Sequence, residues 1–544
     1  DESINIDREE LTWAKDEKEV EERWYKRIKN DTLSQLMAET EIEEIRDNLD
    51  RRYQRQRDVT FQLKADEVFE WFMNAYAKEL GPHTQYMSHV TSENFRINMS
   101  LSLEGIGAAL QTEQDYTVIN RIIPGGPAEV SGEIDPEDKI VAVGQNDEEK
   151  INVIGWRLMD VVQMIRGDKG TVVSLDIIKH DSPPGTPPET IKLVRDVIQL
   201  EDQAAKLSIP SFYSNSGIAQ NGGAKYTATT HDVRQLLGQI KDTDSEGLII
   251  DLRGNGGGYL NEAISLTGLF IPKGPVVQVV QSNQKRQILK DDDLSVAYDG
   301  PMVVLVDRYS ASASEIFAAA LQDYGRAIII GERSFGKGTV QRVAPLRYGD
   351  NVSHESQVKL TTAKFFRING GSTQYDGVTP DVTLNSGIED EEFGERAYEN
   401  ALPWSKTQPA SYESAQFPEA LILDLNRMHS ERSDRSPAFT YLRQNSQRIT
   451  ENKNIKELTL NLNARKSDNE NREQKILAEL NAYRESLGLV SVTMDTRSDN
   501  PLPGEDEHWN TVFHEEAARI LFDQTRWTSN IIAKDIEFDK TVTN

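Results

Sequence analysis

The spacing of apolar residues changes three times along the chain and divides it into four stretches. Residues 1–91 and 406–544 are rich in charge and place apolar residues three or four positions apart, the period of an amphipathic helix. Residues 92–190 contain short apolar runs separated by glycine and proline, which indicates a small strand-rich barrel. Residues 191–405 alternate such runs with helical stretches, which predicts an α/β layer around a largely parallel sheet.

The two helical stretches are expected to bury their apolar stripes and to expose their charged faces. In the first stretch the stripes are Val20, Trp24 and Ile28, and then Val68, Phe69, Phe72 and Tyr76. In the last stretch they are Ile476, Leu480 and Tyr483, and then Val512, Phe513, Ala517, Ile520 and Leu521. Ser436–Pro437 has the form of a helix cap followed by the first helical position.

Composition excludes several classes of function. The chain has 89 acidic and 61 basic residues among 544, and its net charge of −28 argues against binding to nucleic acid or to an anionic lipid surface. No run approaches the roughly 18 apolar residues of a membrane helix. The absence of cysteine excludes disulfides, thiolate metal sites and a cysteine nucleophile. Because the chain starts without a targeting segment, we expect either a cytosolic protein or one whose signal peptide has been removed.

Four landmarks follow one another in the strand-rich stretch. They are the loop Gly105-Ile106-Gly107-Ala108, the turn at 124–128, a strand that starts near Asp138, and a helix over 156–165. This order resembles a PDZ domain, in which a glycine-containing loop presents N–H groups to a peptide's terminal carboxylate and the peptide adds as a strand. We therefore expect Gly105, Ile106, Gly107 and Ala108 to bind a peptide. An unrelated small barrel is the alternative.

A cluster of serines lies where an apolar strand over 302–306 meets a predicted helix over 312–323. Ser310, Ser312 and Ser314 occupy this turn, and the unpaired N–H groups of a helix N-terminus favour the negative charge of an alkoxide or oxyanion. Capping of the helix is the alternative explanation for a serine here. A serine nucleophile needs a base, and none of the eight histidines lies in the α/β segments next to Ser312.

Lys337 is the candidate base. It lies between two glycines, after the adjacent predicted strand, and burial could lower its pKa from about 10.4 toward neutrality. Gln341 could then orient the lysine. The glycine run that follows Asp251 could provide half of an oxyanion hole, and the N–H of Ala313 the other half. The alternatives are that Lys337 is an exposed lysine with no role in the chemistry and that the glycine run is an ordinary turn.

These segments together resemble the C-terminal processing, or tail-specific, proteases. The resemblance rests on the SASASE turn, GERSFGKGTVQ with Lys337 placed 25 residues after Ser312, DLRGNGGG, the PDZ-like module, and the segments 82–87 and 377–381. It extends from about residue 10 to about 405, and the flanking helical stretches are similar to the large periplasmic Prc subgroup. It implies a multidomain α+β protein with N- and C-terminal helical domains, an α/β serine protease core of crotonase or Clp type, and an inserted PDZ domain. The expected bounds are 1–91, 92–190, 191–405 and 406–544.

The resemblance further implies a serine endopeptidase that binds apolar C-termini through its PDZ domain and cleaves with a Ser/Lys dyad. Carried over onto this sequence, the catalytic residues are Ser312, Lys337 and Gln341, the oxyanion hole uses Gly257, Gly258 and Ala313, and the supporting residues are Glu315 and Ser334, where relatives often have threonine. No metal or cofactor is expected. Relatives act in the periplasm of Gram-negative bacteria, some with a lipoprotein adaptor that delivers a peptidoglycan hydrolase.

Two stretches, at 205–210 and 348–356, are shorter here than relatives lead us to expect. Other enzyme classes fit less well. Residues 331–338 nearly match a phosphate-binding loop, but Gly338 stands where Ser or Thr is needed and Pro345 interrupts a following helix. Gly254-Asn255-Gly256 lacks the third glycine of a dinucleotide fingerprint, and His514–Ala518 lacks the second histidine of a zinc protease. A non-catalytic PDZ scaffold would leave the serine and lysine pairing unexplained.

Overall fold

The structure is a computed structural model, and its chain forms two compact units. The larger unit comprises residues 1–88, 237–257 and 263–544, and the smaller comprises 89–236 and 258–262. The residues that the structure describes are 2–7, 11–100, 103–113, 115–122, 126–145, 150–167, 170–180, 182, 186–198, 206–214, 227–240, 245, 247–348, 351–384, 393–498, 500, 502 and 505–542. Helices α8 (Thr229–Ile240) and α9 (Leu260–Thr267) contain boundaries between the units.

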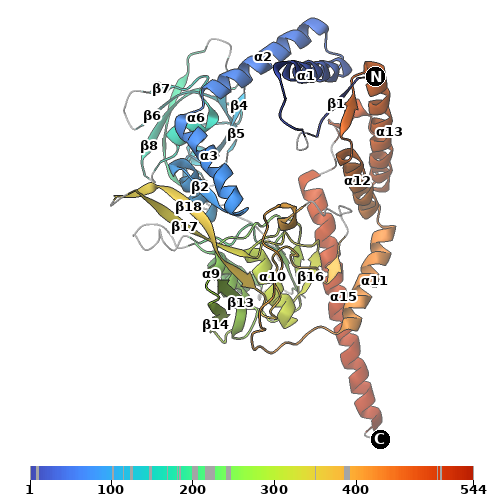
Figure 1. Ribbon diagram of the computed structural model, residues 1–544. Coiled ribbons are helices and arrows are strands. Elements are labelled where there is room, and N and C mark those ends of the chain that lie inside the picture. The colour runs from blue at the N-terminus through green and yellow to red at the C-terminus, as the bar shows by residue number, and fades with distance from the viewer. Residues whose placement is uncertain are drawn as a thin grey trace. The chain divides into compact units, whose positions relative to one another are not determined.

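Four strands of the larger unit run parallel and side by side. They are β12 (Leu248–Asp251), β15 (Met302–Val306), β16 (Ile328–Gly331) and β19 (Val382–Thr383). Helix α10 (Ala313–Tyr324) contacts β16, whereas α15 (Glu505–Val542) contacts β12 and β15, and Figure 1 shows these helices on opposite sides of β16. All five residues of β15 are buried, as expected for a strand of a parallel sheet covered on both faces.

The larger unit also contains an antiparallel sheet. Its order is β14 (Arg286–Asp291), β13 (Gly274–Gln281), β18 (Asn351–Phe366) and β17 (Thr339–Tyr348). The short strand β2 (Gln85–Met87) pairs with β18 at residues 357–359. Strands β17 and β18 were not predicted, because Pro345 and the charged residues obscure the alternation of apolar and polar positions. Pro345 lies at a register shift in this ladder.

Helices form the two ends of the chain in the larger unit. The N-terminal ones are α1 (Glu17–Met37), α2 (Ile42–Phe61) and α3 (Ala65–Leu80), and the C-terminal ones are α11 (Glu419–Arg435), α12 (Pro437–Lys453), α13 (Leu462–Ser486) and α14 (Met494–Arg497), besides α15. Strand β1 (Ser3–Asn5) pairs with β20 (Glu457–Thr459), and a 3₁₀ turn, η1, spans Glu395–Ala397. Ser436 caps α12 by accepting from the N–H of Phe439, as predicted.

The expected burial of the apolar stripes holds at one end of the chain and not at the other. Ala517 and Ile520 of α15 are fully buried against the parallel sheet. In α3, by contrast, Phe72 and Tyr76 remain 68% and 59% exposed, and the stripe over Val20, Trp24 and Ile28 of α1 is also exposed. The prediction of a buried N-terminal stripe is therefore wrong. Strand β2 is the main partner of α3 among the described elements, and one short strand cannot cover a helix face.

The smaller unit contains an antiparallel sheet with helices packed on it. The sheet order is β4 (Ala108–Glu113), β5 (Tyr116–Ile122), β6 (Lys139–Gln145), β8 (Val172–Ile178) and β9 (Glu189–Val194), and β7 (Ile151–Asn152) pairs with β6. The other elements are α4 (His89–Ser100), β3 (Leu103–Gly105), α5 (Pro127–Ser131), α6 (Leu158–Ile165), β10 (Asp196–Ile198) and β11 (Lys206–Ser208). Val161 and Ile165 of α6 are buried in a core that also contains Val173, Leu175 and Ile177 of β8.

Several predicted features lie outside the described residues. They are Pro124 and Gly125 of the second PDZ landmark, and parts of both stretches expected to be short, namely Ala205 and residues 349 and 350. Among the helices that the structure does describe, none combines the length and the apolar character needed to cross a bilayer.

Candidate active site

Ser312 lies at the sharp turn from β15 into α10 and has a strained backbone. Its φ of 57° and ψ of −109° fall outside the regions that residues with a Cβ favour, a conformation that costs on the order of 1–3 kcal/mol. Its N–H donates to Oε2 of Glu315, three residues on, at 2.7 Å. Ser312 thus lies at the N-cap of α10 in a capping box with Glu315, and backbone strain of this kind is concentrated at functional sites in proteins.

The other two serines of the cluster act as structural links. Ser310 Oγ donates to the carbonyl of Leu252 at 2.8 Å, and Ser314 Oγ donates to the carbonyl of Asn255 at 2.9 Å. Both serines are fully buried, whereas Ser312 is only partly buried. These bonds attach the serine turn to the segment that follows β12. Ser312 is therefore the serine of the three that is left for chemistry.

The glycine run after β12 approaches the serine turn very closely. Gly257 has a φ of +105°, and a Cβ added there would lie 2.8 Å from the carbonyl oxygen of Ala311 and 2.9 Å from Cβ of Ser312. Any side chain at this position would displace the turn, so the backbone of Gly257 reaches Ser312 only because the residue is glycine.

Glu315 holds the serine turn and the lysine loop together. Its carboxylate is buried and accepts four hydrogen bonds: from Ser312 N at 2.7 Å, Ser334 Oγ at 2.6 Å, Gly336 N at 2.7 Å and Lys337 N at 2.9 Å. The amides of Ser312 and Lys337 donate to the same oxygen, Oε2, so their backbones must lie close together. Burial raises the pKa of Glu315 to about 7, although the four hydrogen bonds act in the opposite direction.

Lys337 has the electrostatic environment that a general base needs. Burial and, to a lesser degree, the nearby cation of Lys359 lower its pKa to about 8, although Glu395 and Glu315 act to raise it. Among the hydrogen bonds of the described residues, none involves Nζ of Lys337. A substantial neutral fraction at mildly alkaline pH follows from a pKa of about 8. The loop is not a phosphate loop, because the strand β17, and not a helix, follows Lys337.

The residues predicted to orient Lys337 and to form the oxyanion hole differ in whether their hydrogen-bonding groups already have partners. Gln341 donates from Nε2 to Oγ1 of Thr339 at 2.8 Å and to Oγ1 of Thr361 at 3.2 Å, and its contact with Lys337 stays a prediction. Ala313 is the first residue of α10, and none of the recorded bonds between described residues uses its N–H. The N–H of Gly257 donates to Oδ1 of Asn255 at 2.8 Å. Gly258 belongs to the smaller unit, and its role also stays a prediction.

The end of β12 is fixed by the C-terminal helix. Asp251 accepts from Arg253 at 2.8 and 3.0 Å and contacts Nε2 of His514, on α15, at 2.6 Å. Although burial acts to raise it, these partners hold the pKa of the Asp251 carboxyl well below its usual range. In the sequence, His514 belongs to an incomplete zinc-protease motif. In the structure it contacts Asp251, which lies just before the glycine run.

In the smaller unit, the predicted peptide-binding loop connects β3 to β4. Gly107 has a φ of +74°, and the buried Ile106 accepts from Ala128 N at its carbonyl, at 2.7 Å. Strand β4 stands at one end of its sheet and has α6 beside it. Within the described sheet, β4 therefore has an edge to which a further strand can pair, next to a helix, which is the arrangement that PDZ domains use.

Comparison with known families gives a match over each part of the chain. The model for peptidase family S41 matches residues 203–384, and the PDZ domain model matches residues 94–178. The tail specific protease N-terminal domain matches residues 1–90, and the C-terminal domain of tail specific protease matches residues 388–530.

Individual relatives agree with these matches. The tail-specific protease of Haemophilus influenzae is 40% identical over 88% of this chain and 69% of its own length. The chain belongs to peptidase family S41. A carboxy-terminal processing protease, CtpA, of Bacillus subtilis is 33% identical over 55% of this chain and 60% of its own. The PDZ domain of a carboxy-terminal protease from Vibrio cholerae, solved with a peptide, is 44% identical, covers 18% of this chain and 99% of that one, and has a TM-score of 0.18.

Membership of the family confirms the predicted enzyme class and fold class: the chain is a tail-specific, C-terminal processing serine protease with a PDZ domain and helical domains at both ends. Sequence reasoning missed two charged residues of this S41 site, Lys359 and Glu395, because neither lies in a recognisable motif. It also missed the contact of His83 with Glu395, although His83 lies in the segment 82–87 on which the resemblance partly rested.

Replacing Lys359 by glutamine should move the pH dependence of proteolysis. Its positive charge lowers the pKa of Lys337, so its removal raises that pKa. A base must be neutral to act, so activity rises with pH through the lysine pKa, and we expect the acid limb of kcat/KM to move from about 8 to higher pH by up to about one unit. Lys364→Gln, on the same strand, is the matched control. An unchanged limb in Lys359→Gln would show that Lys337 does not limit the rate.

Proposed function

We propose that this S41 peptidase is a serine endopeptidase that cleaves peptide bonds with Ser312 as nucleophile and Lys337 as general base. The observation that carries the proposal is the shared acceptor Oε2 of Glu315, to which both backbones donate. The lowered pKa of Lys337 supports the role of base, and the structural bonds of Ser310 and Ser314 leave Ser312 as the nucleophile of the turn.

In the proposed reaction, neutral Lys337 accepts the proton of Ser312 Oγ as that oxygen attacks the carbonyl carbon of the scissile bond. The resulting ammonium then gives this proton to the leaving amine, and an acyl-enzyme remains on Ser312. In the second half, Lys337 accepts a proton from a water molecule that attacks the ester carbonyl. The ammonium then returns this proton to Ser312 Oγ as the ester C–O bond breaks, which releases the new C-terminus and restores the neutral lysine. Lysine suits this cycle because an ammonium can lose its proton on burial, whereas a guanidinium cannot.

The oxyanion of each tetrahedral intermediate needs donors that are in place beforehand. The N–H of Ala313, at the positive end of α10, is the first proposed donor. The glycine run supplies the second, from Gly257 or Gly258. The N–H of Gly257 donates to Asn255 in this structure, so its use would require that amide to be shared or turned. Gln341 and Ser334 complete the proposed set, as orienting and supporting residues.

Substrate selection is proposed to begin at the PDZ domain. A protein's C-terminal segment would add to the edge of β4, with its carboxylate at the loop Gly105-Ile106-Gly107-Ala108 and its apolar side chains toward α6. Val162 of α6 and Leu110 of β4 are partly exposed and apolar, which favours apolar tails.

The proposed compartment and partners rest on the resemblance to the periplasmic subgroup of tail-specific proteases. We infer action in the periplasm of a Gram-negative bacterium, after signal-peptide removal, on envelope proteins that include a peptidoglycan hydrolase, with a lipoprotein adaptor as partner. The proposed domains are 1–91, 92–190, 191–405 and 406–544.

Ser312→Ala and Lys337→Ala should each lower kcat for a reporter protein with an apolar tail by about 10⁴-fold or more, since each removes a member of one catalytic unit. Cleavage is measured by gel and by mass spectrometry of the products, and folding by circular dichroism. Lys364→Ala, which changes a partly buried lysine of β18, should cleave like the wild type. A Lys337→Ala protein with wild-type kcat would contradict the dyad.

The chemistry of the substrate's tail should control its recognition. Replacing the last two residues of an apolar tail by aspartate should raise KM by about 10-fold or more, because a charged group loses free energy on entering an apolar site. The same two aspartates placed at the N-terminus of the reporter serve as the control. Equal kcat/KM values for the two reporters would show that the tail is not what the PDZ domain reads.

A further inference from the structure

The loop that carries Lys337 is fixed along its whole backbone. Each of the five amides of residues 334–338 donates a hydrogen bond, and the acceptors in chain order are Val378 O at 3.2 Å, Ser310 O at 3.0 Å, Glu315 at 2.7 and 2.9 Å, and Gln374 Oε1 at 2.8 Å. Glu315 and Gln374 are the side chains in this set. Glu315 connects the loop to the nucleophile, and Gln374 connects the loop to a different part of the core.

Gln374 leads to a second buried carboxylate. Its side chain is fully buried, and its Nε2 donates to Oε1 of Glu395 at 2.8 Å and to the carbonyl of Leu402 at 2.9 Å. These two bonds fix which end of the amide faces Gly338, because the nitrogen faces Glu395 and the oxygen remains for the Gly338 N–H. Glu395 also donates from its own N–H to the carbonyl of Phe335 at 2.9 Å. Glu395 is therefore joined to the lysine loop in two ways. Its N–H bonds directly to Phe335, and its carboxylate bonds to Gln374, which in turn binds the N–H of Gly338.

The other carboxylate oxygen of Glu395 is occupied by His83. Nε2 of His83 lies 2.7 Å from Oε2, where an acceptor-only carboxylate requires the ring nitrogen to donate. Glu395 is fully buried, and the side chain of His83 is 14% exposed. A buried carboxylate that loses a hydrogen-bond partner pays a large desolvation cost, so Glu395 depends on this contact.

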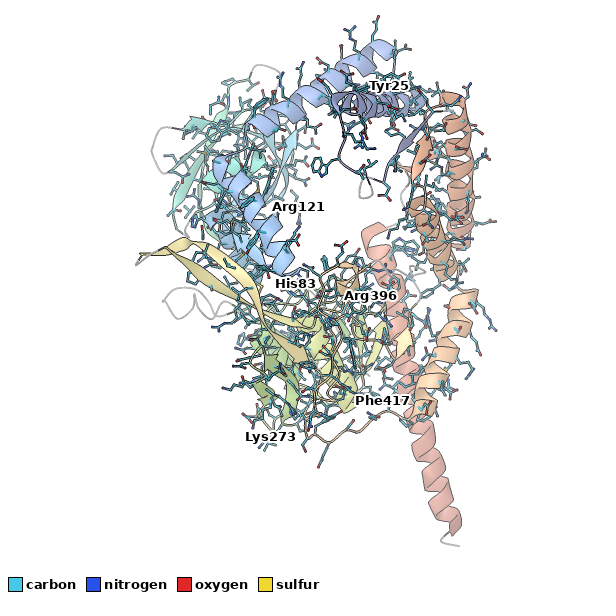
Figure 2. All side chains as sticks on the ribbon, viewed as in Figure 1. Tyr25, His83, Arg121, Lys273, Arg396 and Phe417 are labelled. Atoms are coloured by element: carbon cyan, nitrogen blue, oxygen red, sulfur yellow. The ribbon has the colours of Figure 1, made fainter. Side chains whose placement is uncertain are left out.

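His83 comes from the N-terminal helical region and is held firmly. It follows α3 and precedes β2, whose Gln85 pairs with Lys359 of β18, and Figure 2 shows it just beyond the end of α3. Its ring packs edge-on against Tyr398, at 6.0 Å between centroids, and Tyr398 contacts Phe335 of the lysine loop. A separate contact, from Asn400 to the carbonyl of Lys78, joins the same regions without involving Glu395.

We propose that His83 is a positioning residue for Lys337, acting through Glu395, Gln374 and Gly338, so that the N-terminal helical region supplies part of the active site. The inference rests on the proposed role of Lys337 as the base. Without the His83 contact, the carboxylate of Glu395 could turn and change its hydrogen bond with Gln374. Gln374 would then no longer hold the N–H of Gly338 in place. A displacement of about 1 Å at a catalytic group can cost on the order of 100-fold in rate.

The charges that face Lys337 support the same arrangement. They are Lys359, from β18 of the antiparallel sheet, Glu315, from α10, and Glu395, from η1; the first lowers the pKa of Lys337, beyond the effect of burial, and the two carboxylates raise it. A fixed Glu395 thus sets both the position and the basicity of the lysine. His83 is not a member of a proton-transfer chain here, because its contact is with the carboxylate and not with Ser312.

The test compares His83→Ala with His83→Gln, whose Nε2–H can still donate to Glu395. We expect His83→Ala to lower kcat by about 10- to 100-fold with KM within about 2-fold, and His83→Gln to recover most of this loss. The acid limb of the kcat profile should change in His83→Ala and return in His83→Gln, a response that a loss of folding alone would not give. His89→Ala, at an exposed histidine six positions later in the sequence, should match the wild type.

Asn400→Ala removes the separate contact to Lys78 and should also keep wild-type kcat. If it loses as much as His83→Ala, the N-terminal region acts by docking alone and the proposal is wrong; wild-type kcat in His83→Ala also overturns it. If His83→Ala does not fold, Gln374→Met breaks the link at its second step and should show the same fall in kcat, and wild-type kcat there overturns the proposal. Activity retained in Ser312→Ala or Lys337→Ala would instead overturn the dyad, which separates the two failures.

Discussion

The site depends on one buried carboxylate, that of Glu315, which joins two segments of the core by hydrogen bonds. Glu315 belongs to the first turn of the helix behind Ser312, yet three of its four hydrogen bonds come from the loop of Lys337. A buried carboxylate must have its oxygens satisfied, so the loop cannot move away without leaving the charge unpaired. The cost of burial thereby becomes a geometric constraint on Ser312 and Lys337. Glu395 is a second buried carboxylate, and its two oxygens accept from Gln374, which holds Gly338 of the loop, and contact His83.

The strained backbone of Ser312 and the close approach of Gly257 also hold the site in one geometry. The backbone of Ser312 is held in an unfavourable conformation, and only glycine at position 257 lets the neighbouring segment approach it. Both features need a rigid surround, which the fully buried strand β15 and helix α10 provide. The remaining serines of the turn donate to the carbonyls of that neighbouring segment, so the sequence SASASE places the proposed nucleophile, Ser312, between two serines with structural roles.

Local pattern was enough to predict a parallel sheet, α10, the serine cluster and Lys337, because buried apolar runs and glycines at the ends of strands are visible in the sequence. The choice of Ser312 among the three serines came from the family resemblance, and the short parallel strand β19 was not predicted. Local pattern was also not enough for β17 and β18, where Pro345 and charged residues mask the alternation, or for α3, whose apolar face is exposed. Glu395 and His83 lie 312 positions apart and meet only through the tertiary fold, and no spacing rule could join them. Lys359 was missed for the same reason, since its influence on Lys337 is purely spatial.

The most direct test of the central claim, that Lys337 activates Ser312, is the pH dependence of covalent labelling by a fluorophosphonate, with the modified residue mapped by mass spectrometry. We predict a single adduct, on Ser312, whose rate of formation rises with pH to a plateau through an apparent pKa of about 8 and is lost in Lys337→Ala. An adduct on a different serine, or a labelling rate on Ser312 that is indifferent both to pH and to the loss of Lys337, would contradict it.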